Sequence, residues 1–315
     1  MSRFPAPGDI KAAHQRIKSY IHETPVFTSR SINKILDSKI YFKCENMQKA
    51  GAFKYRGATN AVLSLTKDEA QYGVATHSSG NHGAALTLAA RLHGVKSYVV
   101  MPRSAPSVKR KAVENYGAEI ILCEPTLQSR EENLEEVVRK TKAIFIHPYN
   151  DLRIICGQAT SCLELLDEVN DLDMIITPVG GGGLLSGTAL CAAHFSSGTK
   201  VIGAEPAGAD DAFRSLTVGE IQPSVNPRTI CDGLLTSLGN LTFPIIQKYV
   251  ERIMTTEDQY IIDAMRLIWE RMKLIVEPSA AITLAVLLKH EHIARNKKVG
   301  IILSGGNVDL DNLPW

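Results

Sequence analysis

The sequence predicts an α/β protein of two lobes, in which each lobe is a mainly parallel, twisted sheet flanked by helices. Three observations predict this class. Short runs rich in β-branched residues alternate with amphipathic stretches of helical period along the chain. Strands that alternate with helices pair in parallel, because each helix returns the chain to the same edge of the sheet. At 315 residues the chain is long enough for two lobes.

The predicted elements follow this alternation in chain order. The predicted strands are short and rich in β-branched or aromatic residues, and they lie at 39–45, 73–78, 96–102, 118–124, 143–148, 173–179, 200–205 and 298–304. The predicted helices share an apolar face, and they lie at about 81–93, 106–117, 130–141, 157–169, after 183, 258–274 and 279–291. The units between 73 and 148 are expected to form a small domain, and residues 1–72 and 149–315 a large domain.

Composition and charge exclude several classes of protein. Apolar residues make up 44% of the chain, charged residues 22%, and the net charge is +2, so neither nucleic acid nor a membrane surface is an expected partner. The N-terminus lacks the apolar core of a signal peptide, and no apolar run is long enough to span a membrane. Six scattered cysteines without a C-x-x-C pair indicate free buried thiols and a cytoplasmic protein.

The loops that follow strands are the expected place for chemistry, because ligands of open α/β sheets bind outside the carboxyl ends of the strands. The turn SSGNHG at 78–83 begins a helix and offers backbone N–H groups to an anion. Asn81 adds an amide to this turn and Ser79 a hydroxyl. A capped strand-to-helix turn explains the same residues, so this motif alone does not decide between the two interpretations.

The four glycines at 180–183 lie between a buried strand and a helix. Glycines lose more backbone entropy on folding than other residues, and this cost is offset if the backbone must close around a phosphate. No Gly-Lys-Ser/Thr follows, and Ser186 stands where a dinucleotide fingerprint has its third glycine. Glu205 nevertheless ends the next strand about 20 residues on, as a ribose-binding acid would, so a nicotinamide enzyme stays an alternative at this point.

Two further loops carry polar side chains. The loop EPAGADD contains Glu205, Asp210 and Asp211, whose carboxylate oxygens are typical ligands of a hard divalent cation. Acids at a helix N-terminus explain the same spacing, and the spacing alone favours that explanation. In SGGN, Ser304 follows an apolar strand and would point into the crevice, although a simple turn is the alternative.

The stretch GAFKYRG places Lys54 between two aromatic residues. We expect an apolar pocket and the neighbouring Arg56 to lower the pKa of this amine and favour its nucleophilic form. Pyridoxal 5′-phosphate needs such a lysine for its Schiff base, donors for its phosphate, and partners for its ring oxygen and nitrogen. A lone lysine is usually a surface residue, so the prediction depends on its combination with the glycine loop.

GAFKYRGA, SSGNHG, GGGGLLSG and LSGGN, in this order, resemble the fold-type II (tryptophan synthase-like) pyridoxal phosphate enzymes over essentially the whole chain. EPAGADD, TICDGLL, WERMKLIVEPSAA and SGGNVDL resemble the branch of serine racemases and serine/threonine dehydratases within that family. The resemblance implies Lys54 as the Schiff-base lysine with Phe53 beside the ring, Asn81 on the ring hydroxyl, and Ser304 on the pyridine nitrogen.

The resemblance also implies three binding loops. The phosphate loop comprises Gly180, Gly181, Gly182, Gly183 and Leu184, and the substrate carboxylate loop comprises Ser78, Ser79, Gly80, Asn81 and His82. A divalent cation, Mg²⁺ with Ca²⁺ or Mn²⁺ as alternatives, would be held by Glu205, the Ala209 carbonyl and Asp211.

The implied activity is serine racemisation with accompanying serine/threonine dehydration to a keto acid and ammonia. Lys54 would act on one face of the substrate and Ser79 on the other, where biosynthetic threonine dehydratases carry alanine. The alternatives are a threonine or threo-3-hydroxyaspartate ammonia-lyase without significant racemisation, and a non-catalytic sensor. Cys156 replaces a common alanine of the family, and we expect little effect on the chemistry.

The resemblance carries three expectations beyond the site itself. It implies a small amino acid substrate, a homodimer and nucleotide activation. The chain ends at Trp315, which leaves no room for the regulatory domain of feedback-inhibited threonine dehydratases.

Overall fold

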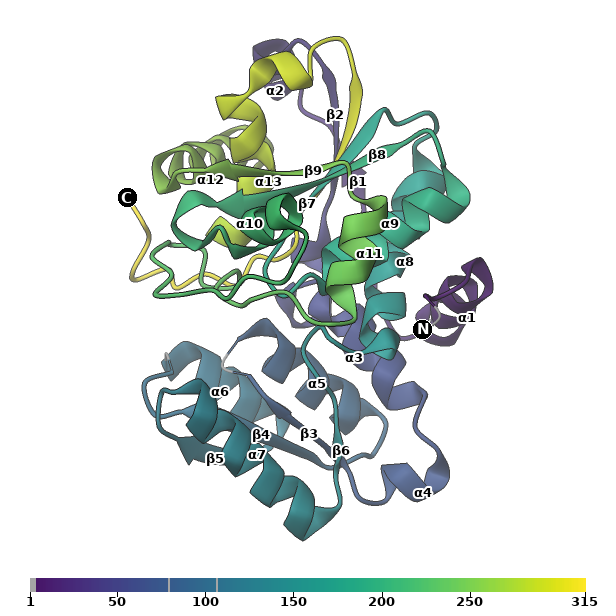
Figure 1. Cartoon of the computed structure of the whole chain (residues 1–315), viewed down its shortest axis with the longest axis vertical. Helices are drawn as coiled ribbons and strands as arrows, with labels where there is room; N and C mark the ends of the chain where they lie inside the picture. Colours follow the sequence, from purple (N-terminus) through teal and green to yellow (C-terminus); the bar gives the residue numbers. More distant parts are fainter. Residues whose placement is uncertain (1–3, 79, 106) are drawn as a thin grey trace.

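The computed structural model describes residues 4–78, 80–105 and 107–315, and it confirms the α/β class with two parallel-sheet lobes (Figure 1). In the described residues, one sheet has the strand order β1-β2-β10-β7-β8-β9 and the other has the order β5-β4-β3-β6. In Figure 1 the larger sheet lies in the upper lobe and the smaller sheet in the lower lobe.

The larger sheet is assembled from distant parts of the sequence. Its strands are β1 (Val26–Phe27), β2 (Lys39–Lys43), β7 (Met174–Pro178), β8 (Lys200–Pro206), β9 (Arg252–Thr256) and β10 (Lys298–Ile302). All its neighbouring strands run parallel except β1, which pairs antiparallel with β2. The two-residue β1 was not predicted, because a run this short carries no periodic signal.

The smaller sheet is local in sequence and entirely parallel. It consists of β3 (Val74–His77), β4 (Ser97–Pro102), β5 (Glu119–Cys123) and β6 (Ile144–Phe145), which alternate with α5 (Asn81–Leu92), α6 (Ser107–Tyr116) and α7 (Leu127–Thr141). Every one of these elements falls within 73–148, although the domain boundaries themselves stay a prediction.

The remaining helices accompany the larger sheet or connect the lobes. They are α1 (Pro7–Ile17), α2 (Arg30–Leu36), α3 (Lys54–Leu63), α4 (Lys67–Ala70), α8 (Leu152–Glu168), α9 (Gly183–Phe195), α10 (Asp211–Val218), α11 (Thr242–Tyr249), α12 (Asp258–Met272) and α13 (Pro278–Lys289). Helix α8 begins earlier than predicted, because the Asp151 side chain caps it by accepting the Arg153 N–H at 2.8 Å. Helix α3 was missed because nearly all of it is buried, so no polar face marks a helical period.

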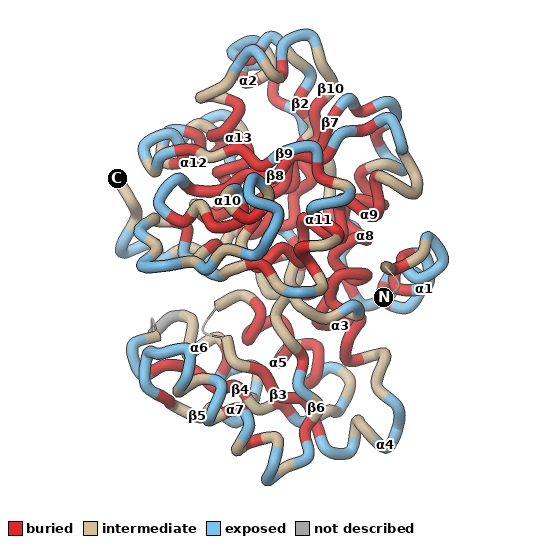
Figure 2. The backbone as a smooth tube through the Cα atoms, in the orientation of Figure 1, coloured by how far each residue is buried: buried red, intermediate tan, exposed pale blue. Residues whose placement is uncertain are grey.

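The core is continuous along the strands at the centre of the larger sheet (Figure 2). All five residues of β7 are buried, as expected for a parallel strand covered by helices on both faces. All six cysteines are buried and free, which confirms the prediction. Within the described ranges, no helix combines the length and apolar character needed to cross a bilayer.

Candidate active site

Lys54 begins α3 at a point where two distant segments are joined by their backbones. The Phe53 N–H donates to the Ser304 carbonyl at 2.9 Å, and Ala52 forms an isolated antiparallel bridge with Gly305. The end of β10 therefore lies beside the start of α3. This arrangement brings the predicted Schiff-base lysine and the predicted pyridine partner, Ser304, into the same site.

The Lys54 amine occupies a half-buried position, and no carboxylate of the described residues is in contact with it. Its Nζ donates to the Pro148 carbonyl at 2.9 Å and lies 5.2 Å from the centroid of the Phe53 ring. Burial lowers the pKa of this amine to about 8, and the charge of Glu277 opposes the shift only in part. The neutral, nucleophilic form is thus accessible near neutral pH.

Arg56 does not act as predicted. Its guanidinium donates to both oxygens of Glu45 (2.7 and 2.8 Å) and to both oxygens of Glu164 (2.6 Å each), and all three side chains are buried. Its charge is therefore neutralised by two carboxylates, and burial alone accounts for the lowered pKa of Lys54. The expectation that Arg56 lowers that pKa was wrong. Arg56 instead fixes the first turn of α3 against α8.

Asn81 lies at the start of α5 and connects the small lobe with two loops of the large lobe. Its amide nitrogen donates to the two carboxylate oxygens of Glu277 at 2.9 and 3.1 Å, and its oxygen accepts from Asn307 at 3.0 Å. Burial, with the charge of Asp232, raises the pKa of Glu277 to about 7. Sequence reasoning assigned no role to Glu277 or Asn307, although both stand inside motifs that carry the family resemblance.

The glycine loop packs too closely on its neighbours to accept side chains at two of its positions. A Cβ on Gly181 would come within 2.3 Å of the Tyr149 ring, and Gly182 has φ +88°, a left-handed conformation that favours glycine. Among the described residues, the N–H groups from Gly181 to Leu184 have no hydrogen-bond acceptor. Unpaired N–H groups at the start of α9 form a cradle that fits a phosphate.

The predicted carboxylate loop lies at the start of α5. The Ser78 hydroxyl accepts the N–H groups of Gly80 (3.4 Å) and Gly83 (3.2 Å) and so stabilises the turn. His82 is buried with its Nδ1 unpaired among the described residues, and burial, followed by the charge of Lys54, lowers its pKa well below the ordinary range. Ser79 lies outside the described residues, so its role stays a prediction.

The acidic loop buries two of its three carboxylates, Glu205 and Asp211. Glu205 is buried and accepts the N–H groups of Ala212 (2.8 Å) and Phe213 (2.7 Å). Both oxygens of Asp211 are buried and have no hydrogen-bond partner in the part of the chain that the structure describes. Asp210 instead pairs with Arg214 at 2.8 Å.

Burial raises the pKa of Glu205 to about 8 and that of Asp211 to about 6, and the charge of Arg214 opposes the shift of Asp211 only in part. The buried Ala209 ends the short turn between them, at Ala207–Ala209. The described residues contain no cluster of three or more His, Cys, Asp or Glu side chains suited to a metal. A cation at this loop would therefore depend on two carboxylates and backbone carbonyls, and it stays a prediction.

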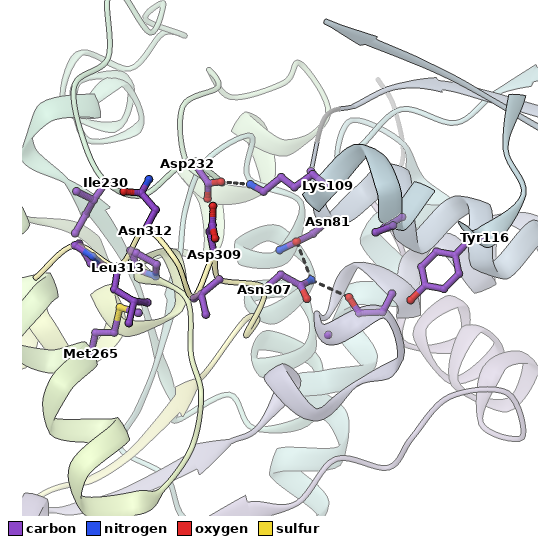
Figure 3. Close-up of a pocket in the computed structure, with 18 residues that line it drawn as sticks. Asn81, Lys109, Tyr116, Ile230, Asp232, Met265, Asn307, Asp309, Asn312 and Leu313 are labelled. Carbon is purple, nitrogen blue, oxygen red and sulfur yellow. Dashed lines mark hydrogen bonds and ion pairs between the residues drawn. The ribbon is translucent and has the colours of Figure 1, made fainter. Parts of the chain in front are cut away.

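A cavity of about 490 Å³ opens between the lobes beside Asn81 (Figure 3). Lys109 on α6 forms an ion pair with Asp232 of the large lobe, and Asn81 accepts a hydrogen bond from Asn307 of the same lobe. Neither Lys54 nor the glycine loop lines this cavity. It therefore adjoins the candidate site through Asn81 and does not include Lys54.

Taken together, these features of the site indicate a class of enzyme. A lysine of lowered pKa, a phosphate cradle at a helix start, and polar side chains from both lobes suit a pyridoxal phosphate site. Residues 17–305 match the family described as "Pyridoxal-phosphate dependent enzyme", and the chain belongs to that family.

Individual relatives narrow the class further. The serine racemase of Dictyostelium discoideum is 52% identical over 309 residues, which cover 97% of this chain and 95% of the relative. The beta-hydroxyaspartate dehydratase of Paracoccus denitrificans is 48% identical over 311 residues, which cover 99% of both chains. The predicted resemblance to the racemase and dehydratase branch is thereby confirmed.

Solved structures agree with these relatives. The crystal structure of the Dictyostelium discoideum serine racemase superposes with a TM-score of 0.93, covering 96% of this chain and 98% of that one. The crystal structure of a T.th. threonine deaminase superposes equally well, with a TM-score of 0.93 at 40% identity, and the match covers 97% of this chain and 99% of that one. The similarity therefore extends over both lobes.

Proposed function

We propose that this protein is a pyridoxal phosphate-dependent serine racemase that also dehydrates serine and threonine. The observation that carries the proposal is the placement of Lys54: its pKa is lowered to about 8, its amine donates to the Pro148 carbonyl, and the preceding Phe53 N–H donates to the Ser304 carbonyl. The identity to serine racemases over nearly the whole chain supports the choice of substrate.

The described residues fit the cofactor at each of its polar ends. The unpaired N–H groups of the glycine loop, continued by Leu184, would hold the phosphate. Asn81 would contact the ring hydroxyl, and the buried Ser304 hydroxyl the ring nitrogen. The bound cofactor supplies a carbonyl carbon for the amines and a conjugated ring that accepts electron density from the substrate Cα.

The protein's own groups would move the proton. Lys54 Nζ takes the α-proton on one face of the substrate, which requires the neutral amine that a pKa of about 8 makes accessible. Ser79 would return a proton on the opposite face and invert the centre. The turn at Ser78, Gly80 and His82 would orient the substrate carboxylate through backbone N–H groups at the start of α5.

A second candidate is dehydration of threonine or 3-hydroxyaspartate without significant racemisation. The 48% identity to a beta-hydroxyaspartate dehydratase favours it. In either reaction Lys54 Nζ removes the same α-proton. The outcome then depends on whether the β-hydroxyl leaves before a proton returns.

Several further features belong to the proposal. The unpartnered Asp211 oxygens support a divalent cation, most simply Mg²⁺, at Glu205, the Ala209 carbonyl and Asp211. We also propose a homodimer and nucleotide activation from the family resemblance, a cytoplasmic location from the scattered free cysteines, and a small domain at 73–148 from its alternating strands and helices.

The test is incubation of the purified holoenzyme with L-serine, L-threonine and threo-3-hydroxyaspartate, followed by chiral separation and keto acid assay. The proposal expects D-serine and pyruvate from L-serine. In Ser79→Ala, D-serine formation should fall far more than pyruvate formation. Pyruvate without D-serine in the unchanged protein would favour the second candidate, and no product from any substrate would reject both.

A further inference from the structure

The turn between β6 and α8 contacts the candidate site through two consecutive residues, and its third residue contacts the loop before α11. The Pro148 carbonyl accepts from Lys54 Nζ at 2.9 Å. The Tyr149 ring packs so closely on the glycine loop that a Cβ on Gly181 would come within 2.3 Å of it. The Asn150 side-chain oxygen accepts the N–H of a residue in the loop before α11 at 2.8 Å. This turn therefore connects the lysine to the phosphate cradle.

The His147 side chain forms hydrogen bonds with the backbone of the same turn. Its Nδ1 accepts the backbone N–H groups of Tyr149 at 3.3 Å and Asn150 at 2.9 Å. Only an unprotonated ring nitrogen can accept from two N–H donors, so the ring is neutral with its proton on Nε2. Burial, together with His77 and Lys54, lowers the pKa of His147 to about 4, so the ring stays neutral across the physiological range.

The His147 ring is itself fixed by packing. Its centroid lies 4.5 Å from the ring of Tyr149, 5.6 Å from that of Phe145 and 6.1 Å from that of His77. These contacts come from both ends of the turn and from β3. The imidazole thus combines a hydrogen-bond acceptor with an aromatic surface, and the two properties are separable by substitution.

We propose that His147 is a positioning residue of this enzyme, which fixes the turn that sets the Pro148 carbonyl against Lys54 and the Tyr149 ring against the glycine loop. The inference rests on the proposed roles of Lys54 and the glycine loop in cofactor binding. The hydrogen bonds accepted by Nδ1 fix the turn, because without them the backbone N–H groups of Tyr149 and Asn150 would have no partner.

Two variants separate the acceptor from the ring. His147→Asn keeps a side-chain acceptor within reach of the following N–H groups, as in an Asx-turn, but removes the ring. His147→Phe keeps the ring and removes the acceptor. Phe145→Leu is the matched control, because it alters packing on the same imidazole and leaves both hydrogen bonds in place.

The readouts need no turnover. Hydrogen–deuterium exchange of the apoprotein would follow the peptide that contains residues 149 and 150, and an absorbance titration would give its Kd for pyridoxal phosphate. In His147→Phe we expect exchange and Kd each to rise about tenfold, the effect of one lost hydrogen bond. His147→Asn and Phe145→Leu should stay within about threefold of the unchanged protein. Circular dichroism would verify that each variant folds.

Unchanged exchange and Kd in His147→Phe would overturn the inference. So would an equal loss in His147→Asn and His147→Phe, since that result would assign the effect to the ring. If His147→Phe does not fold, retention of both values in His147→Asn supports the inference and their loss overturns it. A protein that binds the cofactor as expected but converts none of the amino acids would reject the proposed function alone.

Discussion

Lys54 and Arg56 lie two residues apart at the start of α3, and their surroundings shift their pKa values in opposite directions. Burial lowers the pKa of Lys54 to about 8, and the charge of Glu277 offsets that shift only in part. Burial also acts to lower the pKa of Arg56, but Glu45 and Glu164 outweigh it and hold the guanidinium charged. The partners of a buried cation therefore decide whether it serves as a base or as an anchor.

The largest expected effect comes from removing the Lys54 amine. Lys54→Ala should lower both racemisation and elimination by more than about 10³-fold, because the substrate then loses the base that takes its α-proton. The assay is D-serine and pyruvate formation from L-serine. Lys49→Ala is the matched control, since its amine bonds to the Tyr20 carbonyl at the surface. Activity of Lys54→Ala within tenfold of the unchanged enzyme would contradict the assigned role.

The buried ion pairs of Arg56 should contribute to the free energy of unfolding. Glu164→Gln removes a carboxylate shared by Arg56 and Lys43, so the free energy of unfolding should fall by about 3–5 kcal/mol. Urea titration measures this change. Glu136→Gln, on the exposed face of α7, should change stability little, although it also loses two ion-pair partners. Equal changes in the two variants would show that burial does not distinguish these networks.

The acidic loop is the opposite case, because its buried carboxylates form no ion pair among the described residues. A divalent ion at 100 times its Kd would stabilise the fold by about 2.7 kcal/mol. EDTA should therefore lower the melting temperature, and Mg²⁺ should restore it. Asp211→Asn should abolish this response, whereas Asp210→Asn, whose carboxylate pairs with Arg214, should keep it. A melting temperature indifferent to EDTA and Mg²⁺ would reject the cation site.

The smallest effect concerns pH. Below pH 8 most Lys54 amines carry a proton, so labelling of Lys54 in the apoprotein by an amine reagent should rise with pH and level off above about 8. An ordinary lysine would level off above about 10.4. Glu277→Gln removes a charge that favours the ammonium, so its midpoint should move to lower pH. Peptide mass spectrometry follows the labelling, and an unshifted or raised midpoint in Glu277→Gln would contradict this electrostatic account.

The sequence predicted the fold class and most of the strands, because alternation between apolar strands and amphipathic helices is visible locally. It also predicted that Lys54, Asn81, Ser304 and the glycine loop form one site; the structure places the backbone of Phe53 beside Ser304, and the assembled site stays a prediction. The buried helix α3 escaped prediction because no polar face marks its period.

Two features of the site could not be predicted for a different reason. The role of Arg56 depends on Glu164, which is 108 positions away, and that of Asn81 depends on Glu277, which is 196 positions away. Contacts of that separation are set by the packing of the lobes and have no local signature. The effect of His147 on the turn is equally invisible in sequence, since it depends on which ring nitrogen faces the backbone.

The most direct test of the central claim is to reduce the holoprotein with borohydride and map the modified peptide by mass spectrometry. We expect the pyridoxyl group on Lys54 and on no other lysine. Attachment to a different lysine, or an unmodified Lys54 in protein saturated with the cofactor, would contradict the claim.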